Sequence, residues 1–327
     1  MGIIGRHSFE LCSRPRIISS ASYVGDKEGK GPLRECFDKI CRDDTLGLDS
    51  WEQAESRMFE SAVRVALAKI KRQSDDLSCL LGGDLLNQII SSGFAAREIR
   101  APFIGLYGAC STISEGLMLG GMLVDGGFAE LAACAASSHF SAAERQFRYP
   151  LEMGVQAVPS SQRTVTGAGS IIIQAAGEFR PGAGNVFEHV ALTGGTIGSV
   201  EDFGITDANN MGAAMAPAAF KTIKTHLSDY SRRVEDYDRI ITGDLGIFGS
   251  DMLYELLRGE GIEIADRHED CGKLMFSPEQ NVNCGASGCG CAATIMSSWF
   301  LPKIESGEIR RVLFLATGCL LYTSDAA

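Results

Sequence analysis

The residues most able to do chemistry lie in a turn of small side chains, Gly108-Ala109-Cys110. The polar pair Ser111-Thr112 follows this turn, and Glu115 comes three residues after Thr112. This pattern is typical of a capping box, so we expect a helix to begin here. The positive end of a helix lowers the pKa of a nearby thiol and attracts anions. Cys110 is therefore predicted to be either a nucleophile or the floor of an anion-binding site.

The composition excludes several classes of protein. The 327-residue chain is 45% hydrophobic, which is enough for a large core in one or two domains. Its net charge of −11 argues against a nucleic-acid groove and against a polybasic membrane anchor. The 11 cysteines are dispersed, and the first residues contain no secretory signal, so we expect reduced thiols in the cytoplasm. The sequence contains no apolar stretch long enough for a membrane span.

One region rich in glycine and cysteine could suggest a cofactor. Cys284, Cys289 and Cys291, with Cys271 nearby, are spaced unlike the ligands of a structural zinc site. The glycine loop at 285–290 lacks the Lys-Ser/Thr of a phosphate loop. We therefore expect neither a metal nor a cofactor.

Hydrophobic periodicity predicts alternating helices and strands. The expected helices cover residues 51–72, 86–97, 113–125, 215–227 and 292–301, and the expected strands cover 78–82, 131–136, 164–173, 238–242 and 312–317. The motif Gly83-Asp84-Leu85 recurs 160 positions later as Gly243-Asp244-Leu245, and the strand at 131 has its match at 312. This repetition predicts an ancient duplication with an insertion, in which parallel sheets are covered by helices.

The duplication divides the chain into two predicted halves. The first covers 1–180 and contains Cys110; the second covers 181–318, with the linker at 177–184. Residues 142–159 are polar and are predicted to form a long functional loop. Residues 319–327 resemble the translated end of a sequencing-library adapter. We therefore expect the second half to be truncated near Gly318.

Several long motifs occur in order along nearly the whole chain. They are GDLLNQ at 83–88, GACST at 108–112, SSHFSAAERQFRYPLEMG at 137–154, VTGAGS at 165–170, GITDANNMGAAMAPAA at 204–219, TGDLGIFGS at 242–250 and HEDCG at 268–272. With these motifs the chain resembles the stage V sporulation protein AD family of spore-forming bacteria, within the thiolase-like superfamily. The resemblance implies an α/β thiolase-like fold, whose duplicated βαβ halves form a layered αβαβα core.

The resemblance also implies a function and partners. A member of this family is expected to bind pyridine-2,6-dicarboxylic acid (dipicolinic acid) and to support its uptake into the developing spore. It would act with other stage V sporulation membrane proteins of the same operon. Its expected location is cytoplasmic and peripheral at the inner membrane of the forespore or spore. Because thiolase-like folds usually pair, we also expect a homodimer, and we expect no nucleic-acid partner.

The thiolase-like fold offers an enzymatic alternative. Condensing enzymes combine an acyl-accepting cysteine with a His and a second His, Cys or Asn, which activate the nucleophile and form the oxyanion hole. Cys110 supplies the first part, but loop 281–288 lacks the Gly-His-Pro of thiolases. By strand position, Gly243-Asp244 and Ala286-Ser287 lie where the synthases carry histidine and asparagine. Binding is therefore favoured, and a Cys110-dependent acyl-CoA acyltransferase or condensing enzyme is the alternative.

A dicarboxylate ligand would need cationic partners and N–H donors. Arg145 and Arg148 are candidates because guanidinium groups bind carboxylates bidentately, although they could instead pair with neighbouring glutamates. Tyr149 or Phe147 could stack on a pyridine ring. The candidate ligand residues are Cys110, Ser111, His139, Arg145, Arg148 and Tyr149.

Four further polar residues have both functional and structural interpretations. His139 ends a strand at the sheet edge where α/β proteins bind ligands, so it is either a site residue or a structural one. His268 lies in an insertion-like loop, where we expect a surface position, with an inward swing as the alternative. Asp84 and Asp244 each follow a glycine at a strand end, so they are predicted to be turn residues rather than acids.

Overall fold

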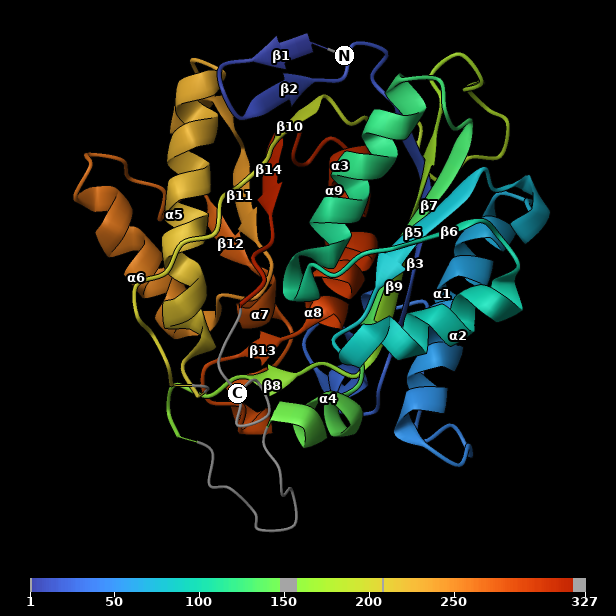
Figure 1. The fold of residues 1–327 in the computed structure, drawn as a ribbon, viewed down its shortest axis with the longest axis horizontal. Coiled ribbons are helices and arrows are strands. Elements are labelled where there is room, and N and C mark those ends of the chain that lie inside the picture. The colour runs from blue at the N-terminus through green and yellow to red at the C-terminus, as the bar shows by residue number, and fades with distance from the viewer. Residues whose placement is uncertain (1, 148–157, 208, 320–327) are drawn as a thin grey trace.

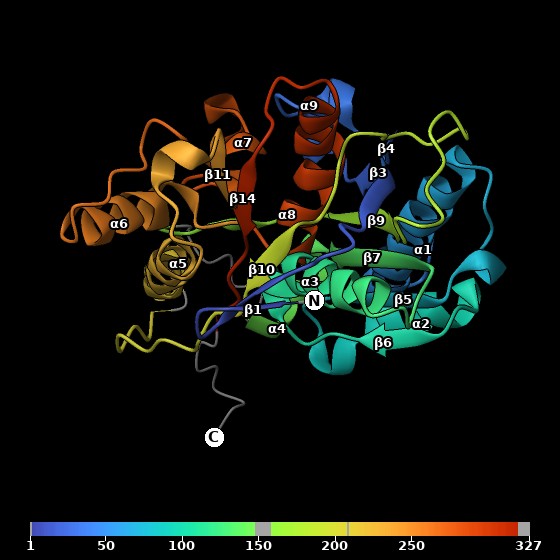
Figure 2. The ribbon, with the colours of Figure 1, turned by 90° about the horizontal axis from the view of Figure 1, so that it is seen from above.

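Helices and sheets alternate in layers in the computed structural model, which describes residues 2–147, 158–207 and 209–319 (Figures 1 and 2). Helices α1 (Trp51–Lys69) and α2 (Ile90–Ile99) cover the outer face of the larger sheet. Helices α3 (Thr112–Asp125) and α8 (Cys289–Ile295) lie between the two main sheets. Helices α5 (Met211–Asp229) and α6 (Gly246–Arg258) cover the outer face of the smaller one.

The larger sheet has six strands in the order β4-β3-β9-β7-β5-β6. They are β3 (Arg16–Val24), β4 (Lys39–Ile40), β5 (Cys79–Gly83), β6 (Phe103–Gly105), β7 (Leu131–Ser138) and β9 (Gly167–Gln174). Strand β9 runs antiparallel to both of its neighbours, whereas the other pairs are parallel. The prediction of parallel sheets is therefore wrong for β9. The sequence shows where a strand lies but carries no signal for its direction.

The smaller main sheet has three parallel strands in the order β12-β11-β14. They are β11 (Arg239–Thr242), β12 (His268–Asp270) and β14 (Val312–Leu315). Two minor sheets complete the strands: the antiparallel set β1 (Gly2–Ile4), β2 (Ser8–Glu10) and β10 (Gly194–Thr196), and the parallel pair β8 (Arg163–Thr164) and β13 (Ala286–Ser287).

The remaining helices are short. They are α4 (Phe140–Phe147), α7 (Cys271–Leu274) and α9 (Leu301–Glu305), which continues α8 through a π-helical turn at Met296–Phe300. Turns of 3-10 helix occupy Glu28–Lys30, Arg34–Cys36, Ser74–Asp76, Asn87–Ile89, Ala109–Ser111, Val234–Asp236 and Pro278–Gln280. Helix α4 corrects the predicted loop at 142–159, because its first part is helical; residues 148–157 of that segment lie outside the described residues.

Apolar clusters join the layers. One packs Met58 and Phe59 of α1 against Leu80 of the larger sheet. The central cluster includes Ile113 of α3 and Ile241 of the smaller sheet, so it joins both sheets through the two central helices. A further cluster packs α5 and α6 onto the outer face of β11. This layering confirms the predicted αβαβα core.

A repeat of elements is visible in their bounds. Helices α1 and α5 both have 19 residues and begin 160 positions apart, at Trp51 and Met211. The 3-10 turns that follow them, Ser74–Asp76 and Val234–Asp236, have the same spacing and lead into β5 and β11. The boundary between the halves near residue 180 stays a prediction.

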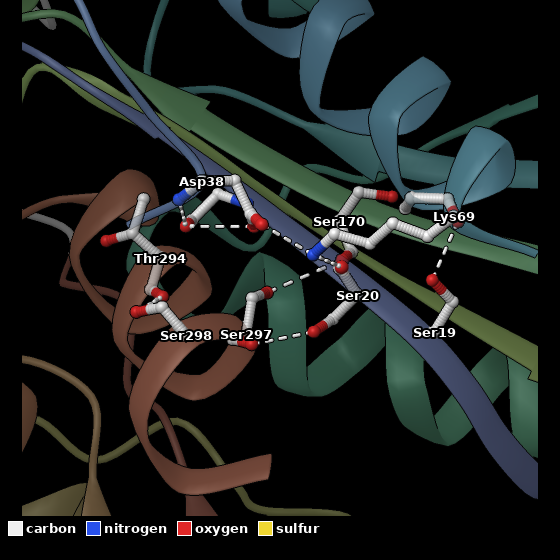
Figure 3. A network of polar contacts seen from close by, with 10 residues as sticks. Ser19, Ser20, Asp38, Lys69, Ser170, Thr294, Ser297 and Ser298 are labelled. Carbon is white, nitrogen blue, oxygen red and sulfur yellow. Dashed lines mark hydrogen bonds and ion pairs between the residues drawn. The ribbon is translucent and has the colours of Figure 1, made fainter. Parts of the chain in front are cut away.

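Strand β3 is polar where it meets its neighbours (Figure 3). The Ser19 hydroxyl donates to a carbonyl of α1, and the Ser20 hydroxyl donates to the carbonyl of Ser297 at 2.6 Å. Lys69, at the end of α1, donates to the carbonyl of Ser20 and pairs with Asp38 at 2.6 Å. These bonds tie β3 to helices on both faces of the sheet.

Gly169 allows α8 to lie directly on β9. A Cβ at this position would come 2.3 Å from the carbonyl carbon and oxygen of Ala293. We predict that Gly169→Ala lowers the free energy of unfolding by about 1–3 kcal/mol, because backbone atoms must move. Gly93→Ala is the control: nothing lies within 4 Å of its Cβ on α2, so a gain of about 0.5–1 kcal/mol is expected. Denaturant unfolding measures both, and equal effects would contradict the close contact.

Candidate functional site

The turn that carries Cys110 is held in an unusual backbone conformation. Ala109 has φ of 49°, in the left-handed region that costs an L-residue about 1–2 kcal/mol. Its carbonyl accepts hydrogen bonds from the Thr112 hydroxyl at 2.7 Å and from the Cys289 thiol at 2.9 Å. The turn is thus fixed by α3, in the first half of the chain, and by α8, in the second half.

The predicted capping box at the start of α3 is wrong. The 3-10 turn runs straight into α3, so Ser111 already has helical backbone angles. Its hydroxyl donates to the carbonyl of Gly108 at 2.7 Å instead of accepting from a backbone N–H. The hydroxyl of Thr112 likewise donates backward. Serine and threonine make such backward bonds whenever their own backbone is helical.

The thiol of Cys110 faces the carboxyl of Asp244, which comes from the other half of the chain. Cys110 is 4% exposed and Asp244 is fully buried. Burial raises the pKa of Cys110 well above its ordinary value, and Asp244, Cys289 and Cys319 raise it further. The predicted low pKa is therefore wrong, because burial and a neighbouring acid outweigh the end of a helix.

The pKa of Asp244 is also shifted from its ordinary value. Oδ2 accepts a hydrogen bond from the N–H of Gly288 at 2.8 Å, and no other hydrogen bond from a backbone group reaches the carboxyl among the described residues. Burial raises its pKa to about 7, although the thiol of Cys110 and the N–H of Gly288 oppose the shift. Near neutral pH this pair therefore consists of a thiol and a partly protonated carboxyl, and it is not the ion pair of an activated nucleophile.

The two repeated aspartates have diverged in their contacts. Asp84 accepts from the N–H of Leu86 at 2.8 Å and from the N–H and hydroxyl of Ser92, both at 2.7 Å, so it holds the turn after β5. After β11 that task belongs to Asp270, which accepts from the N–H groups of Leu245 and Gly246. Asp84 thus has the predicted turn role, whereas Asp244 faces Cys110 instead.

The histidines lie elsewhere. His139 is fully buried, and its Nε2 lies 2.9 Å from the carbonyl of Asp44. His268 lies on the buried strand β12, so the expected surface position is wrong. Its ring bonds to the hydroxyls of Thr242 and Tyr254, and burial lowers its pKa to about 3. Each ring is thus engaged by structural partners rather than by Cys110.

The predicted ligand residues divide into two groups. Cys110 and Ser111 lie together in the turn before α3. Arg145, on α4, pairs with Glu52 and stacks over Trp51 at 5.5 Å, so it belongs to the surface between α4 and α1. Arg148 and Tyr149 lie outside the described residues. Asp244 and Cys289 both contact this turn, and sequence reasoning assigned neither of them to the site. The repeat of Asp84 at Asp244, together with Asp270 in HEDCG, was the signal that could have found the first.

Solved structures share this architecture. The chain is similar to a variant of Xanthomonas campestris OleA, with 12% identity, a TM-score of 0.61 and coverage of 94% of this chain and 95% of that one. It is similar to 3-oxoacyl-(acyl carrier protein) synthase III from Pseudomonas aeruginosa PAO1, with 12% identity, a TM-score of 0.55 and the same coverage. With the layered core described above, these likenesses show a thiolase-like fold.

Sequence comparison identifies the particular family. The family model of stage V sporulation protein AD matches residues 5–326. Stage V sporulation protein AD of Bacillus subtilis (strain 168) is 42% identical over 322 residues, which cover 98% of this chain and 92% of that protein. The chain therefore belongs to the stage V sporulation protein AD family. Among the described helices, none combines the length and the apolar character that a bilayer crossing requires.

The raised pKa of Asp244 predicts a loss of folding stability that depends on pH. The folded chain retains a proton that the unfolded chain releases between pH 3.8 and about 7, so stability falls as pH rises through this window. The full shift corresponds to roughly 4 kcal/mol. Because an amide does not ionise, Asp244→Asn should raise Tm by several degrees at pH 8 and progressively less toward pH 4.5.

Thermal unfolding at several pH values measures this effect. Asp238→Asn is the control with the opposite sign, because N–H groups of Arg311 and Arg310 lower the pKa of Asp238. Asp238→Asn should therefore lower Tm most at pH 8. A constant Tm difference for Asp244→Asn across this range would show that Asp244 does not carry the shift.

Proposed function

We propose that this sporulation protein binds dipicolinic acid and supports its uptake into the developing spore. Membership of the stage V sporulation protein AD family supports this proposal. The expected partners are membrane proteins of the same operon, and the expected place is the cytoplasmic side of the forespore or spore inner membrane.

The groups around Cys110 are the observation that favours binding over catalysis. A condensing site needs a base that leaves the cysteine as a thiolate. Here the facing group is a buried acid, and the groups that most raise the pKa of Cys110 are acidic or thiol groups. A protonated Asp244 can donate a hydrogen bond to a carboxylate, and the positive end of α3 favours an anion. These groups suit one carboxylate of a small dicarboxylic acid.

Binding should therefore depend on pH with a definite sign. Both carboxyl groups of the ligand are ionised between pH 6 and 8, whereas Asp244 loses its proton near pH 7. Above that pH the charged carboxyl repels the ligand, so Kd should rise up to tenfold per pH unit. We expect calorimetry to show saturable binding at pH 6 and weaker binding at pH 8, and Asp244→Asn to remove this difference.

Substitution of Cys110 tests the pocket, and substitution of another buried thiol, Cys79, is its control. Cys110→Ala should weaken binding, because the thiol lines the proposed pocket. Cys79→Ala removes a buried thiol from the far end of β5 and should leave Kd unchanged. Absence of saturable binding at millimolar dipicolinate would reject the proposal, as would equal Kd values at pH 6 and 8.

Acyl transfer through Cys110 is the second candidate. The observation that favours it is Asp244, whose pKa of about 7 would let it accept a proton from the thiol near neutral pH. Incubation with acyl-CoA followed by mass spectrometry separates the two functions. A stoichiometric thioester on the Cys110 peptide, lost in Cys110→Ala, would support acyl transfer over binding alone.

We also propose a homodimer formed through β6. This strand ends the larger sheet, and Ile104 on it and Tyr107 beyond it are 41% and 73% exposed. Ile90 and Phe94 of the neighbouring helix α2 are exposed as well. An apolar, unpaired edge of this kind is suited to pairing with a second copy.

Light scattering tests the dimer. We expect twice the chain mass for the parent protein and a monomer for Ile104→Lys, because the lysine would place charge at the paired edge. Phe128→Lys is the control, since Phe128 is more exposed but lies in the turn before β7. A monomeric parent protein, or equal dissociation by both substitutions, would reject β6 as the interface.

A further inference from the structure

A second thiol, that of Cys289, lies beside the turn of Cys110. Cys289 is the first residue of α8, and it is fully buried. Its thiol donates to the carbonyl of Ala109 at a distance of 2.9 Å between Sγ and oxygen. Ala109 immediately precedes Cys110, so this bond acts on the peptide group that orients the Cys110 side chain.

The acids around the two thiols are exchanged between the halves. Cys110, from the first half, faces Asp244, from the second. Cys289, from the second half, has Asp84 and then Glu55, from the first half, as its strongest charged neighbours. Asp84 and Asp244 occupy equivalent positions of the repeat. Thiols and acids from both halves are therefore close enough to shift one another's pKa, and only Cys110 belongs to the binding site proposed above.

We propose that Cys289 is a positioning residue, whose thiol holds Ala109 in its left-handed conformation and thereby keeps Cys110 against Asp244. Three donors reach the Ala109 carbonyl: the backbone N–H of Thr112, which closes the 3-10 turn, and two side chains, the thiol of Cys289 and the hydroxyl of Thr112. Glycine would adopt φ of 49° without strain, but this position carries an alanine. The two side-chain donors add to the backbone bond of the turn and supply the constraint that alanine needs.

The acids near Cys289 explain why a thiol can serve as a permanent donor. Burial, Asp84 and Glu55 raise the pKa of Cys289 well above its ordinary value, so the thiol keeps its hydrogen at every physiological pH. Glu55 is itself fixed, because the hydroxyls of Ser137 and Ser91 donate to its carboxyl. Cys289 is therefore suited to donating a hydrogen bond and not to attacking a substrate.

Alkylation of Cys110 reports on this role without any ligand. The rate at which iodoacetamide modifies the Cys110 peptide is followed by mass spectrometry between pH 7 and 10. Among the described residues, Asp244, Cys289 and Cys319 are the titratable groups that most raise the pKa of Cys110. In Cys289→Ala the turn relaxes and Cys110 moves away from Asp244. We expect alkylation at pH 8 to become about tenfold faster, equivalent to a fall of one pKa unit.

Three variants separate positioning from general packing. Cys289→Ser keeps a donor and should restore a rate within about threefold of the parent protein. Cys79→Ala loses the same atoms from another buried site and should leave the rate unchanged. Ala109→Gly combined with Cys289→Ala should suppress the increase, because glycine does not need the donor.

The outcomes are decisive. An unchanged Cys110 rate in folded Cys289→Ala, or the same increase in Cys79→Ala, would overturn the proposal. If Cys289→Ala does not fold, Thr112→Val removes the other side-chain donor and should also accelerate alkylation; an unchanged rate there would also overturn the proposal. The proposal rests on Cys110 being the site, but not on dipicolinate: failure of dipicolinate binding with the expected alkylation pattern would reject the ligand and leave the positioning role standing.

Discussion

Two main sheets share one pair of central helices, and this sandwich is the constraint on which the site depends. A helix covered on all sides has no face for water, so its residues must be apolar or small all round. Every residue of α8 is buried, and its sequence is CGCAATI. Close contacts follow from the small side chains, as at Gly169, where β9 lies against the backbone of Ala293. The N-terminal ends of α3 and α8 are therefore also buried, and the candidate site lies there.

The chemistry of the site depends on burial, because the free energy of desolvation here is larger than the effect of the helix end. The end of a helix stabilises a nearby charge by about 0.3–1 kcal/mol, rising to about 2 kcal/mol in favourable cases. Moving the pKa of Asp244 from 3.8 to about 7 corresponds to roughly 4 kcal/mol in the opposite direction. Desolvation therefore dominates, and Cys110 keeps its proton although it precedes a helix. A cysteine in the sequence position of a nucleophile need not have the pKa of one.

The sequence predicts the fold well where the signal is periodic or repeated. Helices α1 and α5 and strands β7 and β11 lie where apolar spacing and the 160-residue repeat predict them. The direction of β9 and the 3-10 turn before α3 are not predicted, because both depend on contacts between distant segments. His268 illustrates the same limit: its loop-like sequence forms a buried strand paired with β11.

The site itself is only half predictable, for a physical reason. Local sequence reveals Cys110 because a turn of small residues followed by a helix start leaves a signature within a few residues, although the expected capping box does not form. Asp244 could not be assigned in the same way, since its copy Asp84 shows that the same motif also serves as a plain turn. What separates the two is Asp270, which accepts the turn N–H groups in the second half. Once a second acid holds the turn, the repeated aspartate no longer needs those N–H groups and can face another side chain. In a repeated motif, an unchanged aspartate can thus be freed to face another side chain when a second acid takes over its structural task.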